Sequence, residues 1–311
     1  MMQRVCLGLD TSNYTTSVAL YGADGTIQQQ KQLLPVKAGE RGLRQSDALF
    51  HHVRQLPELM EALSPDGIQV IAVSDRPREA EGSYMPCFLA GVGAARELAA
   101  VLRVPLYTFT HQQGHVAAAL YGAGRLDLFE KRFLAFHVSG GTTDALLVEP
   151  HKDTVITCRQ VAGSLDLKAG QLIDRVGVAM GLPFPAGIEL EKLALKAGGT
   201  YAPKPSMEGT SCHLSGAENQ CRARLERGEP AEEVARFCLD YVRTTLTEMT
   251  ERLLLEYGDL PLVYAGGVMS NSILRAALVD RFGGSFAPPA FSADNAAGVA
   301  LLGATKGGDG I

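Results

Sequence analysis

The chain has 311 residues, 46% of them hydrophobic and 20% charged, a balance that suits a folded protein with a sizeable core and excludes a disordered or fibrous chain. Its 29 Lys and Arg residues against 34 Asp and Glu residues give a formal charge of −5, so no broad basic face for nucleic acid is expected, although a small basic groove stays open. No apolar run reaches the roughly 18 residues of a membrane helix. Six scattered cysteines without a Cys-x-x-Cys pair, and no signal-peptide pattern, predict reduced thiols and a cytoplasmic protein.

The first part of the chain predicts a mixed sheet covered by helices. Apolar periodicity indicates strands at 5–10 and 15–21, a third strand ending near Leu34, a helix over 43–63, a strand at 68–73, a helix over 87–102 and a strand at 104–109. Residues 74–86 form a polar loop between strand and helix. This β-β-β-α-β-α-β order is typical of an α/β layer architecture.

The second part repeats the opening design. A helix over 111–120 begins after Thr110, a plausible N-cap, and precedes a strand at 133–138, a polar turn at 139–143 and a returning strand at 144–149. Further expected elements are helices at 172–180, 188–197, 230–257 and 271–282, a loop at 198–216, a strand at 260–265 and a last helix from about 296. Two hairpins of one design predict a duplicated, two-lobed protein rather than a single Rossmann unit.

Two glycine pairs follow predicted strands, in the turns 139–142 and 266–268. Glycine lets a ligand approach the backbone closely, and the N–H groups of such a turn can bind an anion. Each pair alone is more simply explained as a plain turn. Together with the duplicated hairpins, they favour a nucleotide cleft.

His111 and His115 lie one helical turn apart, a spacing that suits two ligands of one metal ion. The alternative is a polar helix start with two incidental histidines. A zincin protease is disfavoured because Gln112 stands where that motif needs a glutamate base. His137 in an apolar strand and Asp294 at a helix start have structural interpretations as well, as a core histidine and an N-cap.

Two arginines lie in the polar loop, Arg76 and Arg78, with Glu79 and Glu81 close by in sequence. They form ion pairs within the loop or act as a clamp for a carboxylate or phosphate. The pattern leaves both interpretations open.

The segments taken in this order resemble the TsaD family, the threonylcarbamoyl transferases of tRNA modification that were formerly called glycoproteases. The matching segments are 7–12, 111–115, 138–141, 169–175, 181–187, 265–271 and 293–296. The resemblance implies an α/β fold of the two-lobed hexokinase/actin (ASKHA) type with duplicated mixed sheets. It implies a first lobe at 1–108, with 294–311 packing back onto it, and a second lobe at 109–293, with the metal and nucleotide site at the interface.

The resemblance also implies the site residues. One divalent metal, iron or zinc, would be held by His111, His115 and Asp294, with His137 where archaeal and eukaryotic members carry a metal-ligating tyrosine. An adenine nucleotide or acyl-adenylate would contact the turn at its phosphate, through His137, Val138, Ser139, Gly140 and Gly141. Its ribose would contact Asp174, Gly187 and Glu191, and its adenine would contact Asn271.

Departures from the family pattern indicate a divergent paralogue. The usual Ser-Cys-Asp-Glu-Thr turn reads Ser-Asn-Tyr-Thr-Thr at 12–16, so both acids are replaced, the second by Thr15. Thr142 replaces the bacterial histidine, Gln171 replaces a glutamate, and the loop with Arg76 and Arg78 replaces a Gly-Pro-Gly element. We expect these arginines to contact an anionic part of a different substrate.

Three functions follow from this comparison. The leading one is a metal-dependent threonylcarbamoyl or carbamoyl transfer from an acyl-adenylate, with tRNA adenosine as the default acceptor. The second is a non-catalytic nucleotide-binding paralogue that regulates a partner, and the third is a metal-dependent hydrolase. The partners implied are the adenylate, tRNA and a TsaB-like protein, and no membrane.

Overall fold

The computed structural model describes residues 4–12, 14–35, 43–63, 65–292 and 296–308. The chain divides into two compact units: unit 1 holds residues 1–131, 148–158 and 290–311, and unit 2 holds 132–147 and 159–289. The helix that begins after Thr110 belongs to unit 1, because it packs along the C-terminal helix. The sequence placed this helix at the start of the second lobe.

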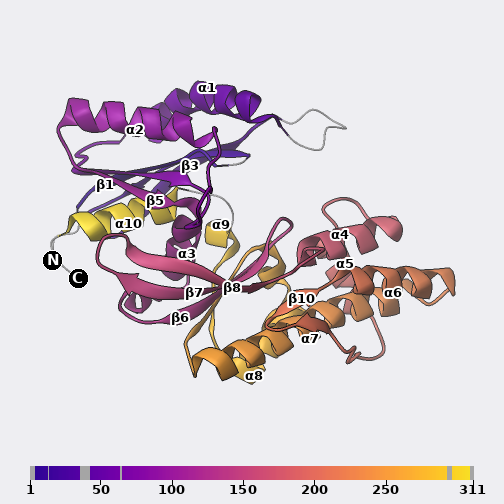
Figure 1. Cartoon of the computed structure of the whole chain (residues 1–311). Helices are drawn as coiled ribbons and strands as arrows, with labels where there is room; N and C mark the ends of the chain where they lie inside the picture. The colour runs from indigo at the N-terminus through magenta and orange to yellow at the C-terminus, as the bar shows by residue number, and fades with distance from the viewer. Residues whose placement is uncertain (1–3, 13, 36–42, 64, 293–295, 309–311) are drawn as a thin grey trace. The chain divides into compact units, whose positions relative to one another are not determined.

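Unit 1 is a five-stranded sheet with helices on both faces (Figure 1). Its strands are β1 (Cys6–Asp10), β2 (Thr15–Tyr21), β3 (Ile27–Leu33), β4 (Val70–Arg76) and β5 (Leu106–Thr110), in the order β3-β2-β1-β4-β5. Helices α1 (Gln45–Leu63) and α2 (Phe88–Leu102) cover one face, and α3 (His111–Gly122) and α10 (Ala297–Gly307) cover the other. The central strand β1 is buried along its whole length, as expected for an apolar run covered on both faces.

Unit 2 is built on a second five-stranded sheet. Its strands are β6 (Phe133–Val138), β7 (Thr143–His151), β8 (Val155–Gly163), β11 (Leu262–Ala265) and β12 (Ser285–Phe286), in the order β12-β11-β6-β7-β8. Its helices are α4 (Ala169–Ala179), α5 (Gly187–Ala194), α6 (Ser215–Glu226), α7 (Ala231–Tyr257) and α8 (Ser272–Phe282). The outer part of the β7–β8 hairpin, residues 148–158, is counted in unit 1.

The two sheets share one topology. In each, three strands consecutive in sequence lie side by side, and two later strands add beside the first of them. The later strand next to the first runs parallel to it in both sheets, β4 beside β1 and β11 beside β6. The predicted mixed α/β fold with duplicated sheets is therefore confirmed.

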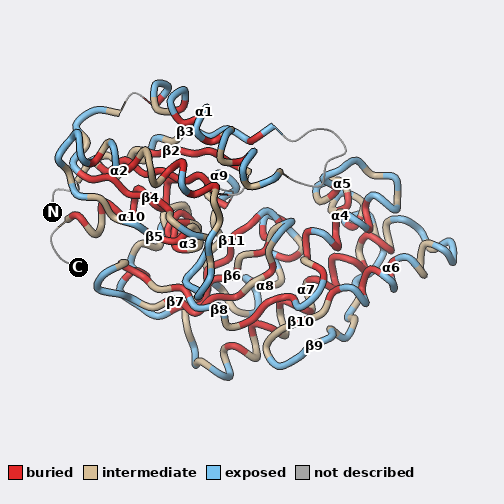
Figure 2. Tube along the Cα trace, turned by 45° about the horizontal axis from the view of Figure 1, so that its top comes forward, coloured by how far each residue is buried: buried red, intermediate tan, exposed pale blue. Residues whose placement is uncertain are grey.

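Burial follows the strands and the inner faces of the helices (Figure 2). In unit 2 the core lies on α7, and three aromatic rings from neighbouring strands stack within it. The Tyr264 ring lies 5.2 Å from that of Phe136 and 4.6 Å from that of Phe286, centroid to centroid. These stacks fix β6, β11 and β12 side by side and thereby place the turn that follows β6.

Small elements complete the chain. They are two 3-10 turns, η1 (Leu126–Glu130) and η2 (Gly267–Ser270), the short helix α9 (Pro289–Ser292), and the hairpin of β9 (Ser206–Glu208) and β10 (Ser211–His213). The prediction of an unbroken loop at 198–216 was wrong, because this hairpin forms inside it and α6 begins at Ser215. Asp294 and Asn295, the predicted cap of the last helix, lie outside the described residues.

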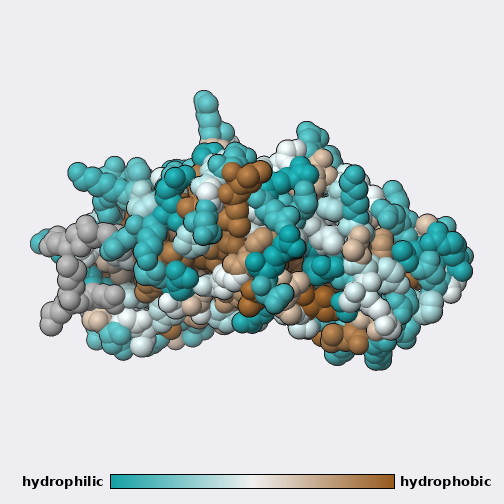
Figure 3. Space-filling view, turned by 90° about the horizontal axis from the view of Figure 1, so that it is seen from below, coloured by the Kyte–Doolittle hydropathy of each residue, from teal (hydrophilic) through white to brown (hydrophobic). Residues whose placement is uncertain are grey.

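Hydrophilic residues cover most of the face in Figure 3, and hydrophobic residues come in several separate groups. Within the described parts of the chain, no helix combines the length and the apolar character needed to cross a membrane. All six cysteines are buried free thiols.

Candidate functional site

The turn between β6 and β7 contains two exposed glycines, and the packing of the chain leaves room for a side chain at both. The Ser139 N–H donates to the Thr142 carbonyl at 2.8 Å and closes the turn. A Cβ placed on Gly140 or Gly141 would meet no atom within 4 Å, and neither residue has a positive φ. Nothing inside the described structure explains the missing side chains, whereas close approach of a ligand to the backbone would explain them.

Two other glycines at the same place are required by packing. A Cβ on Gly170 would lie 2.6 Å from Gly140 Cα, and the Gly170 N–H donates to Ser139 O at 3.2 Å. Gly266 adopts a φ of +100°, and a Cβ there would lie 2.6 Å from the carbonyl carbon of Val138. These two positions let the start of α4 and the end of β11 approach the turn after β6.

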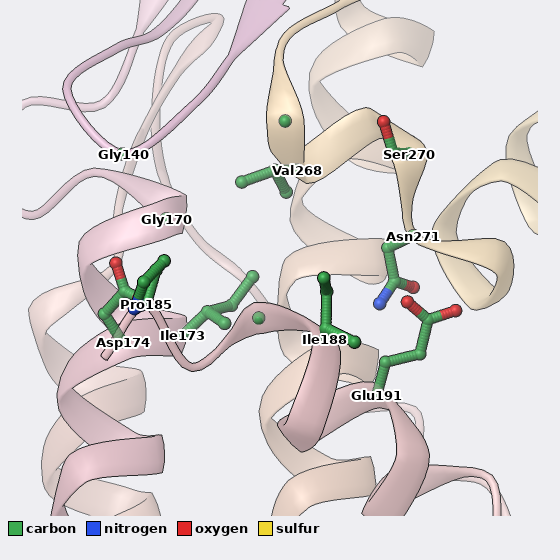
Figure 4. Close-up of a pocket in the computed structure, with 12 residues that line it drawn as sticks. Gly140, Gly170, Ile173, Asp174, Pro185, Ile188, Glu191, Val268, Ser270 and Asn271 are labelled. Carbon is green, nitrogen blue, oxygen red and sulfur yellow. The ribbon is translucent and has the colours of Figure 1, made fainter. Parts of the chain in front are cut away.

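A cavity of about 310 Å³ opens beside this turn in unit 2 (Figure 4). It is lined by Gly140, Gly170, Ile173, Asp174, Pro185, Gly187, Ile188, Glu191, Gly267, Val268, Ser270 and Asn271. Asp174 lies at one end, Glu191 and Asn271 lie at the other, and the apolar side chains of Ile188 and Val268 lie between. The pocket thus offers polar groups at both ends of an apolar middle, as ligand sites commonly do.

The structure brings five of the predicted ligand residues into this pocket: Gly140, Asp174, Gly187, Glu191 and Asn271. Val138, Ser139 and Gly141 lie in or beside the same turn, and His137 lies half-buried near the end of β6. The sequence did not single out Ile173, Ile188, Val268 or Ser270. Gly170 lies in the matching segment 169–175, and a further signal for it is a glycine in the first turn of a helix, where alanine would be favoured.

Local hydrogen bonds orient the three polar side chains. Asn271 is the N-cap of α8, and its Oδ1 accepts from the N–H groups of Ile273 and Leu274 at 3.1 and 3.2 Å. Because that oxygen is engaged, the Nδ2 donors are the part of the amide that a ligand can use.

Each pocket carboxylate uses one oxygen to hold the backbone. Asp174 Oδ1 accepts from the Ala186 N–H and Glu191 Oε1 accepts from the Ser272 N–H, both at 2.8 Å. The second oxygen of each has no hydrogen bond within the described part of the chain. These oxygens can therefore accept hydrogen bonds from ligand hydroxyls.

The histidine pair lies at the start of α3 in unit 1. The two rings meet edge to face with centroids 4.2 Å apart. His111 Nδ1 is 2.9 Å from Oδ2 of the fully buried Asp10, and its Nε2 is 3.4 Å from Ser12 Oγ. Thr110 and Gln113 form a capping box that fixes the first turn of the helix.

Three or more His, Cys, Asp or Glu side chains do not gather into a metal site among the residues that the structure describes. Asp294 lies outside that set, so the predicted site of His111, His115, His137 and Asp294 stays a prediction. His111 and His115 belong to unit 1, and His137 belongs to unit 2.

The loop after β4 is anchored to unit 1 at several points. Pro77 O accepts from the Gln112 N–H at 3.0 Å. Glu79 accepts from Gln113 Nε2 at 2.5 Å and from the Cys158 N–H at 3.3 Å. Burial raises the pKa of Glu79, and the hydrogen bond from Cys158 and the charge of Arg76 work in the opposite direction.

Arg76 forms an ion pair, as the first interpretation expects, and its partner is Asp75 at the end of β4. The Arg76 guanidinium bonds the carboxylate of Asp75 at 3.0 Å, and the side chain is 45% exposed. The backbone N–H of Arg78 donates to Ser83 Oγ at 3.2 Å. Burial raises the pKa of Asp75, although the charge of Arg76 lowers it in part.

Comparison with known proteins places the chain in a family. The TsaD family model, described as tRNA N6-adenosine threonylcarbamoyltransferase, matches residues 37–301. A tRNA N6-adenosine threonylcarbamoyltransferase of Methanopyrus kandleri is 29% identical over 96% of this chain and 86% of its own length. A probable bifunctional tRNA threonylcarbamoyladenosine biosynthesis protein of Methanocaldococcus jannaschii is 27% identical over 96% of this chain. The chain spans 55% of the length of that bifunctional relative.

Solved structures show the same fold at low sequence identity. Full-length HypF, in its phosphate- and nucleotide-bound form, superposes with a TM-score of 0.61 at 12% identity and covers 98% of this chain and 55% of its own. Component A of the (R)-2-hydroxyglutaryl-CoA dehydratase of Acidaminococcus fermentans gives 0.58 at 14% identity, over 98% and 99% of the two chains. The fold is thus of the actin/hexokinase (ASKHA) type. Because the family model matches most of the sequence, the chain belongs to the TsaD family.

Proposed function

We propose that this chain transfers a threonylcarbamoyl or carbamoyl group from an acyl-adenylate to an amine, with tRNA adenosine as the default acceptor. The observation that carries the proposal is the pocket of unit 2. It joins Gly140 and Gly267, whose missing side chains the described packing does not require, to the ligand-facing groups of Asp174, Glu191 and Asn271. Membership of the TsaD family supports the same activity.

The pocket suits an adenylate from end to end. The N–H groups at Gly140 and Gly141 would bind the phosphate. The outer oxygen of Asp174 or that of Glu191 would accept hydrogen bonds from the ribose hydroxyls, and the Asn271 amide would donate to an acceptor of the adenine. The apolar side chains near the middle would cover the faces of the base.

The transfer forms one bond and breaks one bond. The acceptor nitrogen attacks the carbamoyl carbon, the C–O bond to the adenylate phosphate breaks, and AMP leaves with the electron pair while the amine loses a proton. We propose that His111, His115, His137 and Asp294 hold one divalent metal, which would be iron or zinc because imidazole ligands suit these ions better than magnesium or calcium. Such an ion supplies a Lewis acid for the carbonyl oxygen.

His111 and His115 have surroundings that suit metal ligands. The Nδ1 atom of His111 faces a buried carboxylate, the arrangement in which metal-ligating histidines are usually held. His115 presents a second imidazole one helical turn away. Asp10 and the capping box of α3 would orient the pair.

We also propose that Arg76 or Arg78 contacts an anionic part of a substrate that differs from the usual one of the family. The anchored loop would hold these side chains in place, and the 45% exposure of Arg76 keeps its guanidinium accessible. The Arg76→Ala and Arg78→Ala variants test this role. Unchanged activity and affinity in both would assign the loop a structural role only.

Incubation with threonylcarbamoyl-adenylate tests the main proposal, with and without tRNA and a TsaB-like protein. We expect AMP release coupled to labelling of tRNA. AMP release without labelling would indicate a hydrolase, and binding without turnover would indicate a regulatory paralogue. The latter is favoured by Tyr14 and Thr15, which stand where the family usually carries two acids.

A matched pair of variants tests the pocket. Gly140→Ala places a methyl group in the cavity without meeting any other atom of the chain, so we expect an intact fold with weakened AMP binding. Gly199→Ala makes the same change in a loop of unit 2, also in open space, and should leave binding unchanged. Equal affinities for AMP in the two variants would contradict the proposal that the turn at Gly140 and Gly141 binds the phosphate.

A further inference from the structure

Asp10 ends β1 as a fully buried carboxyl group that accepts from two serine hydroxyls and lies against a ring nitrogen of His111. Its Oδ1 accepts from Ser74 Oγ, and its Oδ2 accepts from Ser12 Oγ at 3.0 Å and faces His111 Nδ1 at 2.9 Å. The parallel pairing of β1 with β4 brings Ser74 beside Asp10. Three segments distant in sequence therefore converge on one side chain.

We propose that Asp10 is a positioning residue that fixes the tautomer of His111. An ionised carboxylate only accepts hydrogen bonds, so the ring nitrogen that faces it must carry the proton. The lone pair is then on Nε2, the atom that a metal ion would take in place of the present 3.4 Å contact with Ser12 Oγ. The inference rests on the proposed function, in which His111 is a metal ligand.

The surroundings of Asp10 hold the carboxylate in a single orientation. Ser74 holds one oxygen from the neighbouring strand, and β1 lies at the centre of the sheet. The capping box of Thr110 and Gln113 fixes the helix start from which His111 projects. Both partners of the Asp10–His111 hydrogen bond are thus attached to rigid elements, which is what a preorganised ligand requires.

The test uses the full chain in its metal-free form and reads the protonated ring nitrogen of His111 by nitrogen NMR at a pH where imidazole is neutral. We expect the proton on Nδ1 in the wild type. Asp10→Asn places an amide there that can donate as well as accept, so the Nε2–H form should gain population, as it does when the carboxylate of a Ser-His-Asp triad becomes an amide. Zn²⁺ affinity, measured by calorimetry, should fall by about 10- to 100-fold.

Two further variants keep the inference testable if Asp10→Asn does not fold. Ser74→Ala retains the carboxylate but removes one of its holding bonds, so it should produce a smaller change in the same direction. Asp75→Asn makes the same chemical change as Asp10→Asn at a position that bonds Arg76 instead, and should leave both readouts unchanged.

The outcomes separate this inference from the metal site. Wild-type His111 in the Nε2–H form, or a folded Asp10→Asn variant with wild-type tautomer and Zn²⁺ affinity, would overturn the inference. A wild type that binds no metal but loses its Nδ1–H form in Asp10→Asn would support the positioning role while removing the metal from the proposed function.

Discussion

We expect Asp174 to combine a structural and a ligand-binding role in one carboxylate. Its Oδ1 accepts from the N–H of the buried Ala186, and its other oxygen has no hydrogen bond within the described part of the chain. Asp174→Ala should weaken AMP binding by about 1–3 kcal/mol and also destabilise the fold, because a buried N–H loses its partner. Asp174→Asn keeps an acceptor for Ala186, so we expect wild-type stability with weakened binding. Calorimetry and urea unfolding separate the two effects, and unchanged AMP affinity in both variants would remove Asp174 from the site.

Asp166 ties the segment before α4 to the start of α6, and its effect on stability depends on pH. Burial alone would raise its pKa, but hydrogen bonds from the Ser215 hydroxyl and from the N–H groups of Leu214, Leu167 and Ser215 outweigh burial and lower the pKa to about 2. A lowered pKa stabilises the fold above the unfolded value of about 4, and this stabilisation is lost as the pH falls from there toward 2.

We therefore expect Asp166→Asn to lower the free energy of unfolding by ~1 kcal/mol at pH 7, a figure reduced for the solvent around this partly exposed carboxylate. The difference from the wild type should shrink below pH 4. Urea unfolding at pH 7 and pH 3 measures both values. Asp259→Asn, at an exposed position, is the control. A difference that does not change with pH would contradict this assignment.

Among single residues, the resemblance predicted the polar pocket residues except Ser270 and missed the apolar ones. Asp174, Glu191 and Asn271 lie in recognisable motifs, so their positions could be read from the sequence. Ile188 is 71% exposed on a short helix, and no sequence pattern tells which face of such a helix borders a cavity. The bond from the Ser272 N–H to Glu191 joins residues 81 positions apart, which local patterns do not predict.

Helices α3 and α10 pack closely because Gly298 of α10 has no side chain where it meets the backbone of α3. This contact sets the position of the histidine pair. A Cβ on Gly298 would lie 2.6 Å from Ala118 N and closer still to the carbonyl oxygen of Gly114. Gly298→Ala must therefore push α3 away, and we expect a loss of several kcal/mol in the free energy of unfolding, comparable with overpacked cores. Gly93→Ala is the matched control in α2, where the new methyl group meets nothing within 4 Å.

The control should stabilise the protein by about 0.5–1 kcal/mol, because alanine loses less backbone freedom than glycine in a helix. Thermal and urea unfolding of both variants measure the contrast. Equal stability of the two would show that the crossing tolerates a side chain.

Among the longer elements of the described chain, β8 and α6 have no counterpart in the sequence prediction. Helix α6 has only three buried residues, Ala217, Glu218 and Cys221, so it carries no apolar stripe with helical period. Strand β8 interrupts its apolar pattern with two exposed polar residues. The long helix α7 and the buried strands β1 and β6 were predicted closely, because their burial is continuous or regular.

For the whole molecule, the duplicated hairpins predicted two sheets of one design, and the shared strand order confirms it. Strand β12, which corresponds to β5 of the other sheet, has only two residues, so it could not be predicted from the sequence. The division into compact units also required it, because the last helix and the outer β7–β8 hairpin join unit 1 from distant parts of the sequence. Such long-range packing leaves no local signature in composition or periodicity.

The metal stoichiometry of the whole chain tests the ligand set. We expect one equivalent of iron or zinc in the wild type and its loss in His111→Ala, His115→Ala and Asp294→Ala, because each removes a donor from a four-ligand shell. His137→Ala should retain part of the metal, since bacterial relatives are expected to manage with an apolar residue there. His151→Ala removes an exposed histidine outside the set and is the control. Elemental analysis of the purified variants measures the metal content per chain. A wild-type metal content in both His111→Ala and Asp294→Ala would eliminate the site. A wild-type metal content in His137→Ala alone would reduce the site to three ligands.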